Sequence, residues 1–433
     1  MAVPSRPARL AIASWVVYDL ANTIFSMGVI SLFYPSFVRM AVGEHRADFT
    51  LGLIQGVSYG IIFVLSPLLG AMTDRARRRM PFLMWSTVIC VAATAFIGRG
   101  SFLSSALLFI LANAAYQGGL QFYDALLVEV TTEENRGYVG GIGVGIGYIG
   151  SYIAVAIGLL LGESSFSTMG QFWPLFVWIA GAFLVLAIPC FLLVPERGNP
   201  APRPIFTRAA IRESTAETLR TLREGQQYPG LIRFLVGRIF YTDAINTVIG
   251  FMGLYTTNVA LASGMASDVA GEQKNYVMLC AITLAVPAGF VWGRVTDRFG
   301  PKRTLDWVLF LWMATFALAA AVGAFQLPIA GIYVVACLAG IGLAGTWSAD
   351  RPYMLRLTPP HRIGEFYGLY GMVGRFSAIT GPVIWAVVTY VLVTRSGLPT
   401  TQGQAVAILT LLGMIVLSYR ILRPVTDHRR EWK

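Results

Sequence analysis

The chain has 433 residues, of which 56% are hydrophobic and only 13% are charged. Soluble domains usually carry about 25% charged residues, so this composition excludes an ordinary soluble enzyme and indicates an integral membrane protein. The formal net charge of +11 reflects membrane topology, as described below, and does not indicate a nucleic-acid partner.

Long apolar stretches recur along the whole chain. A membrane-spanning helix needs about 20 mostly apolar residues, and lipid offers the backbone no hydrogen-bond partners. The sequence therefore predicts an all-α membrane protein with twelve transmembrane helices. Their approximate ranges are 11–38, 50–71, 81–98, 103–130, 138–161, 172–194, 231–258, 274–295, 305–325, 329–356, 365–393 and 404–422.

The basic residues are distributed unevenly between the loops. If the N-terminus is cytoplasmic, about 23 of the 33 Lys and Arg lie in cytoplasmic segments. Cytoplasmic segments are the ones in which membrane proteins concentrate Lys and Arg. We therefore expect both termini in the cytoplasm. The basic residues left in the outer loops are Arg39, Arg46, Arg99, Lys274 and Arg395.

A polar segment divides the chain into two sets of six spans. Residues 1–194 are expected to form an N-terminal six-helix bundle, and residues 231–433 a C-terminal one. The linker at 195–230 contains a predicted short amphipathic helix from about Thr207 to Glu224, with partner binding as the alternative to a plain linker role. The four cysteines fall within predicted spans without metal-ligand spacing, so we expect no metal site, no disulfide and no cofactor.

Several short motifs occur twice at a nearly constant offset. "YDLANT" at 18–23 recurs as "YTDAINT" at 241–247, and "GAMTDR" at 70–75 recurs as "GRVTDR" at 293–298. Such repetition predicts two homologous halves, and an even number of spans in each half makes the repeats parallel. Four further residues match at an offset of 226: Gly119, Asp124, Thr132 and Arg136 pair with Gly345, Asp350, Thr358 and Arg362.

These motifs, together with "WVVYDLANTIF" (15–25) and "GEFYGLYGMVGRFSAITGP" (364–382), resemble the major facilitator superfamily. More narrowly, the chain is similar to the autophagy-related vacuolar amino-acid effluxers and their bacterial members. The resemblance implies that the first, fourth, seventh and tenth helices line a central cavity. One departure from the family pattern is Asp124, where the family usually has a neutral Asn.

Each of these four helices carries one aspartate. Asp19 and Asn22 share a helix face, and Asp243 and Asn246 repeat the arrangement. At about 1.5 Å per residue, Asp19 and Asp243 lie roughly 15–18 Å from the cytoplasmic helix ends, near the midplane. Such a site can hold an ammonium group, Na⁺ or a proton. The alternative is a structural pairing of Asp19 with Arg238 or Arg375.

The second aspartate pair lies nearer the cytoplasm. Gln117, Gln121 and Asp124 fall on one stripe, and Asp350 corresponds to Asp124. Two roles remain open for these acids, gate pairing and proton relay, and an intramembrane arginine can bind a solute carboxylate. The candidate solute or proton residues are Tyr18, Asp19, Asn22, Gln117, Gln121, Asp124, Arg238, Tyr241, Asp243, Asn246, Asp350 and Arg375.

Two cytoplasmic loops and one glycine run have other expected roles. The resemblance implies that Asp74, Arg75, Asp297 and Arg298 gate the cytoplasmic side; the alternative is that the basic residues serve only as positive-inside anchors. The glycines at 140–152 recur at helical spacing, which predicts close helix packing in lipid.

The sequence thus predicts a monomeric secondary transporter in a bacterial inner membrane. It is expected to move a small polar solute by alternating access, with proton coupling favoured over Na⁺. The family resemblance implies an amino acid or related zwitterion as the solute and export as the direction. One alternative is an exporter of cationic drugs or metabolites. Another is a non-transporting receptor or assembly factor on the same scaffold.

Overall fold

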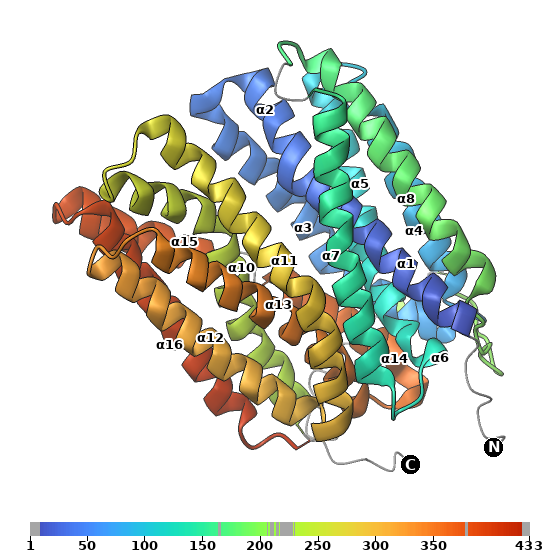
Figure 1. Ribbon diagram of the computed structural model, residues 1–433. Helices are drawn as coiled ribbons and strands as arrows, with labels where there is room; N and C mark the ends of the chain where they lie inside the picture. Colours follow the sequence, from blue (N-terminus) through green and yellow to red (C-terminus); the bar gives the residue numbers. More distant parts are fainter. Residues whose placement is uncertain are drawn as a thin grey trace. The chain divides into compact units, whose positions relative to one another are not determined.

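The computed structural model of the chain describes residues 9–162, 166–205, 207, 212–213, 216, 228, 230–376 and 380–426. Its elements are helices joined by short connections (Figure 1). Eleven helical stretches are long and apolar enough to cross a membrane, and a further apolar helix, Met80–Phe96, has 17 residues. Each of the twelve predicted spans therefore coincides with helical structure, which confirms the all-α fold class.

By their internal contacts the residues divide into two units. The first comprises Met1–Arg223 and Thr358–Met372, and the second comprises Glu224–Leu357 and Val373–Lys433. The eleventh span thus contributes its beginning to the first unit and its remainder to the second. Most of the amphipathic helix predicted from about 207 to 224 lies outside the described residues.

The first unit holds six spans, and the first of these includes a π-helical segment, η1. Glycines allow α7 to approach α1 closely: a Cβ added to Gly150 would lie 2.5 Å from the Leu20 carbonyl oxygen, and one added to Gly143 would lie 2.8 Å from the Trp15 ring. The predicted glycine packing is therefore confirmed. The elements are α1 (Arg9–Phe25), η1 (Ser26–Phe33), α2 (Tyr34–Val42), α3 (Glu44–Arg75), α4 (Met80–Phe96), α5 (Phe102–Ala125), α6 (Leu127–Val130), α7 (Arg136–Leu160), η3 (Met169–Phe172), α8 (Trp173–Leu193), η5 (Pro360–Arg362) and the start of α14 (Ile363–Phe376).

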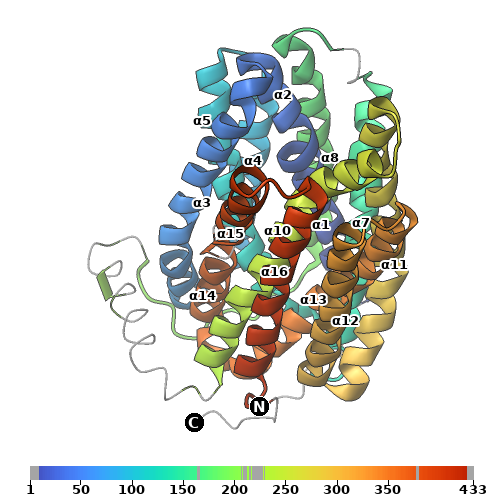
Figure 2. The same ribbon diagram turned by 90° about the vertical axis from the view of Figure 1, so that its left-hand side faces the viewer.

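The second unit is built around α10, which packs against α16 (Figure 2). The contact is close at Gly237, where an added Cβ would lie 2.7 Å from Leu422, and the Ser418 hydroxyl donates to the Gly237 carbonyl at 2.8 Å. The elements are α10 (Leu231–Ala262), α11 (Ser267–Phe299), α12 (Pro301–Ala324), α13 (Ala330–Leu357), the end of α14 (Ile363–Phe376), α15 (Thr380–Thr389), η6 (Tyr390–Arg395) and α16 (Thr400–Leu422).

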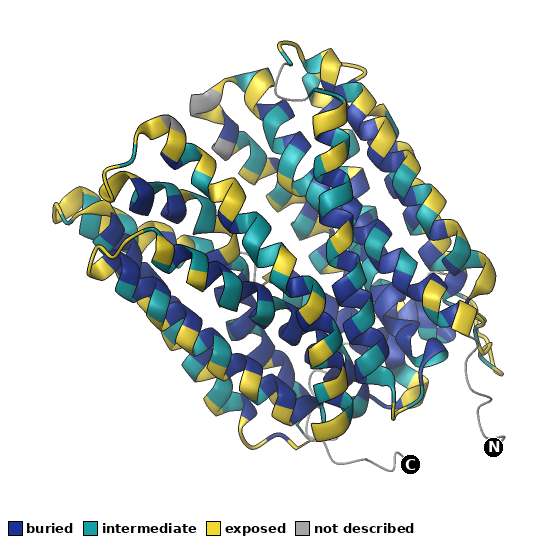
Figure 3. Ribbon diagram, in the orientation of Figure 1, coloured by how far each residue is buried: buried dark blue, intermediate teal, exposed yellow. Residues whose placement is uncertain are grey.

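Exposed residues recur along the outer faces of the helices (Figure 3), and many of them are large and apolar. On α8, for example, Trp178 and Leu192 are exposed, whereas Phe176 and Phe183 are fully buried. Water disfavours so much exposed apolar surface, whereas lipid tails accommodate it. The outer faces therefore suit contact with the bilayer, whereas Asp19, Asp243 and Asp350 are buried.

Candidate functional site

The second unit contains a buried ion pair between α10 and α13. The Arg238 Nε donates to Asp350 Oδ2 at 2.9 Å, and the Tyr241 hydroxyl donates to Asp350 Oδ1 at 2.5 Å. The side chains of Arg238 and Asp350 are 4% and 0% exposed. Both carboxylate oxygens thus accept a hydrogen bond within the unit. Of the two roles predicted for Asp350, gate pairing and proton relay, a paired carboxylate suits the first better.

Asp243 on α10 faces the first turn of α15. It is fully buried, and its Oδ1 accepts from the Gly381 N–H at 2.9 Å. Among the described residues, its Oδ2 has no hydrogen-bond partner, and the same holds for the nearby Thr247 hydroxyl, one turn further along α10. Asn246, which the sequence pairs with Asp243, is only half-buried. Two further residues complete this site: Thr247, which belongs to the repeated motif at 241–247, and Gly381, which was not singled out from the sequence.

In the first unit, Asp19 on α1 lies against the glycine face of α7. A Cβ at Gly143 would lie 3.3 Å from Asp19 Oδ2, and one at Gly147 would lie 3.5 Å from its Cγ. One turn along α1, the backbone carbonyl of Asn22 accepts from the Tyr116 hydroxyl at 3.3 Å. The Asn22 Nδ2 has no hydrogen-bond partner among the described residues. This amide can therefore donate to a ligand next to Asp19.

Tyr18 and Tyr241 have different surroundings. The Tyr18 hydroxyl shares a hydrogen bond of 2.6 Å with Thr87 on α4, and its ring stacks on Tyr123 with centroids 5.1 Å apart. Tyr241 instead binds Asp350, as described above. Tyr18 therefore packs within the first unit, whereas Tyr241 donates a hydrogen bond to the carboxylate of the Arg238–Asp350 ion pair.

The fourth span carries the stripe of Gln117, Gln121 and Asp124. Gln121 accepts from the Ser66 hydroxyl on α3, while Gln117 is half-buried and Asp124 is buried. At the repeat offset of 224 residues, Ser14 corresponds to Arg238. The Ser14 hydroxyl donates to the Leu10 carbonyl at 2.7 Å. The first half therefore has no α1 counterpart of the arginine that binds Asp350.

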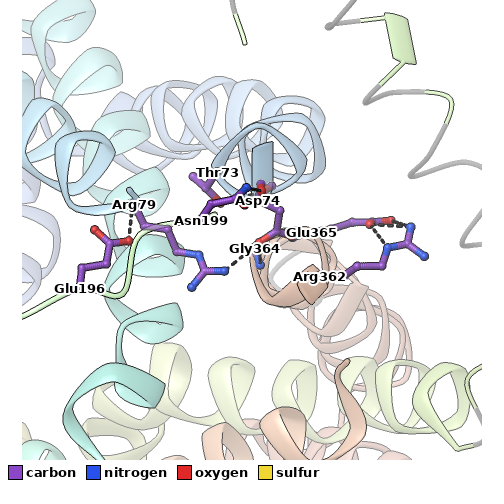
Figure 4. A network of polar contacts seen from close by, with 9 residues as sticks. Thr73, Asp74, Arg79, Glu196, Asn199, Arg362, Gly364 and Glu365 are labelled. Atoms are coloured by element: carbon purple, nitrogen blue, oxygen red, sulfur yellow. Dashed lines mark hydrogen bonds and ion pairs between the residues drawn. The ribbon is translucent and has the colours of Figure 1, made fainter. Parts of the chain in front are cut away.

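Asp74, at the end of α3, binds the first turn of α14 (Figure 4). Its two carboxylate oxygens accept from the backbone N–H groups of Gly364 and Glu365, each at 2.7 Å. The Arg79 guanidinium donates to the same carboxylate at 2.9 Å. A carboxylate at a helix N-terminus satisfies unpaired N–H groups and interacts favourably with the helix dipole. The expected gate residue thus holds the start of the eleventh span.

The linker after α8 supports the loop that carries Asp74. Glu196 accepts from the backbone N–H of Arg79 and, at 2.9 Å, from that of Met80, which caps α4. The Asn199 amide donates to the Asp74 carbonyl at 2.8 Å. Glu196 and Asn199 were missed in the sequence because nothing in the spacing of a polar linker indicates which loop it returns to.

The other expected gate residues have different surroundings. Arg75 pairs with Glu213 at 2.9 Å. Arg298 is exposed, with its guanidinium 5.3 Å from the centre of the Phe299 ring, and Asp297 is half-buried. Arg375, proposed for a solute carboxylate, is buried near the end of α14. Within the described part of the chain, no cluster of His, Cys, Asp and Glu has the arrangement of a metal site.

Replacing Asp74 with Ala is expected to loosen the start of α14. Two N–H groups lose their acceptor, and loss of a helix cap costs about 0.5–2 kcal/mol. Hydrogen exchange of the amides at 363–368 should therefore accelerate. Arg78→Ala, at an exposed position of the same loop, is the matched control. Equal exchange in the two variants would show that Asp74 does not hold this turn.

Comparisons with known proteins identify the family of the chain and two of its relatives. The family model described as "Vacuole effluxer Atg22 like" matches residues 38–422. An uncharacterised MFS-type transporter, YxiO of Bacillus subtilis (strain 168), is 25% identical over 94% of each chain. Autophagy-related protein 22 of Coccidioides immitis (strain RS) is 27% identical over 57% of this chain and 43% of its own, so the chain spans less than half of that fungal relative.

Solved structures give the same fold. The human organic anion transporter MFSD10 has a TM-score of 0.69 at 16% identity, covering 96% of this chain and 99% of that one. The proton:xylose symporter XylE has a TM-score of 0.68 at 13% identity, covering 96% and 94%. At such identities the likeness concerns the fold alone. Because the family model covers residues 38–422, the chain belongs to the vacuole effluxer Atg22-like family. It is a multi-pass membrane transporter of the major facilitator superfamily, not an enzyme.

Proposed function

We propose that this transporter exports an amino acid or related zwitterion across a bacterial inner membrane by alternating access, coupled to proton movement. The observation that carries the coupling is Asp243: a fully buried carboxylate with one oxygen on a backbone N–H and the other without a partner among the described residues. An ionisable group inside a span is costly and usually marks an ion or proton pathway. It lies about 18 Å along α10 from Leu231, the depth at which such transporters bind their solutes.

Two groups in the first unit support the proposed solute class. Asp19 supplies a negative charge, and the Asn22 amide one turn away has a hydrogen available for donation. A carboxylate beside an amide suits an ammonium group that carries a neighbouring acceptor, as in a zwitterion. The family description, vacuole effluxer, supports export. A cation exporter using all four aspartates is less well supported, since Asp350 is already bound by Arg238.

Solute counterflow in proteoliposomes tests the solute class without any imposed ion gradient. Vesicles with purified protein are loaded with an unlabelled amino acid, and uptake of the labelled compound is followed, using a panel of amino acids and organic cations. Transient accumulation of one or more zwitterionic amino acids is expected. Accumulation of organic cations alone would replace the proposal with the cation exporter, and no accumulation with any compound would favour a non-transporting role.

A further inference from the structure

The first turn of α15 is held by a carboxylate from α10, and the contact is confined to a small buried site. Asp243 is 0% exposed and Thr247 is 1% exposed. A Cβ added to Gly381 would lie 1.9 Å from Thr247 Oγ1 and 2.7 Å from Asp243 Oδ1. Both side chains therefore point at the start of α15, and the glycine is what permits the approach.

The site has unused hydrogen-bonding capacity. Asp243 Oδ2 and Thr247 Oγ1 have no hydrogen-bond partner among the described residues, although a buried polar atom without a partner is costly. The Thr380 side chain also lies beside the carboxylate. A proton on Oδ2 would turn this atom into a donor, and the Thr247 hydroxyl oxygen is an acceptor in the same site.

Most charged residues of the elements packed around Asp243 lie near helix ends. Helix α15 has no charged residue, and in α11 and α12 the charged residues lie within the first or last eight positions. Arg238 lies five residues earlier on α10 and is bound to Asp350 on α13. The other charged residues of α13, the second-unit part of α14 and α16 are Arg351, Arg356, Arg375 and Arg420.

We infer that Asp243, Thr247 and Gly381 form a proton-operated latch on α15, through which the charge on Asp243 sets how firmly the eleventh span is held. The inference rests on the proposed proton coupling and adds the element that responds to it. As a carboxylate, Asp243 makes a charge-assisted bond to the Gly381 N–H.

Protonation changes both interactions. One proton adds to Oδ2, no covalent bond of the protein breaks, and the new hydroxyl donates to Thr247. The negative charge at the start of α15 is then lost, so the bond to Gly381 becomes an ordinary neutral one and weakens. Protonation of Asp243 thus weakens the contact that holds the first turn of α15, and deprotonation restores it.

Hydrogen exchange of the full-length protein in detergent tests the latch without needing the solute. Exchange of the amides at 381–385 is measured across a range of pH after correction for the intrinsic rate. In the wild type, protection is expected to fall on the order of tenfold as Asp243 takes up its proton. In Asp243→Asn, protection is expected to be low and independent of pH.

Two variants separate the latch from general packing. Gly381→Ala should remove the pH dependence, because its Cβ displaces the turn from Asp243. Gly250→Ala is the control, since an added Cβ there meets nothing within 4 Å, and it should behave as the wild type. If Gly381→Ala does not fold, Thr247→Val, which keeps the side-chain shape and removes the acceptor, should reduce the pH dependence.

The outcomes distinguish the latch from the proposed function. Protection that does not change with pH in the wild type, or a Gly381→Ala profile identical to that of Gly250→Ala, overturns the latch. A pH-dependent latch in a protein whose transport ignores the proton gradient would instead overturn the proposed coupling and leave the latch standing.

Discussion

Replacing Asp243 with Asn is expected to abolish the stimulation of transport by a proton gradient. The amide keeps an oxygen for the Gly381 N–H but cannot take up or release a proton. In the wild type, each pH unit of the gradient supplies about 1.4 kcal/mol per coupled proton, which corresponds to a factor of about ten. In the variant, the ratio of flux with and without the gradient should fall to about one. Flux of the solute identified by counterflow gives this ratio directly.

The control for this substitution is Asp306→Asn. Asp306 also lies on a span of the second unit, but it is partly exposed and pairs with Lys302 one turn away. Its removal should leave the stimulation intact, because Asp306 lies in the second turn of α12, at the end of the span and away from its middle. If Asp243→Asn retains full stimulation, Asp243 is not the coupling residue. Equal losses in both variants would point to a general effect of removing a carboxylate.

Replacing Arg238 with Leu is expected to destabilise the second unit strongly. Asp350 is 0% exposed, so the substitution leaves a buried charge without its counter-ion. Breaking a buried pair in this way costs about 3–5 kcal/mol, whereas replacing both partners with apolar residues is often close to neutral. The double variant Arg238→Leu with Asp350→Leu should therefore recover much of the lost thermal stability. Thermal unfolding in detergent measures both.

Arg303→Leu provides the comparison for Arg238, since it removes an exposed arginine from α12 and should change the unfolding temperature little. A double variant that is less stable than Arg238→Leu would contradict the interpretation that the unpaired charge causes the loss of stability. It would indicate instead that the hydrogen bond from Tyr241 to Asp350 is important in its own right, and that the three groups act as one network.

The number and places of the spans were predictable from the sequence, because the length and hydropathy that lipid demands are local properties. The glycine packing between α1 and α7 was predictable for a similar reason, since helical spacing puts the glycines on shared faces. The partner of Arg238 was not predictable: spacing excluded Asp243 on the same helix but could not choose among acids on other helices.

The contacts that hold the eleventh span were also not predictable from the sequence. Gly381 is one of 45 glycines, and only the approach of Asp243 and Thr247 gives it a role. Glu196 lies in a segment rich in Pro and Arg, where no periodicity reveals that it caps α4. The reason is the same in both cases: these interactions join segments far apart in the chain, and each needs the backbone of one to meet the side chain of the other.

Solute-driven proton movement tests the central claim most directly. Proteoliposomes containing the wild-type protein are loaded with a fluorescent pH indicator, and the transported solute is added outside without any preformed proton gradient. A pH change inside the vesicles that depends on the solute, and that is lost in Asp243→Asn but kept in Asp306→Asn, is the predicted result. Solute movement of the wild type without any pH change would contradict proton coupling.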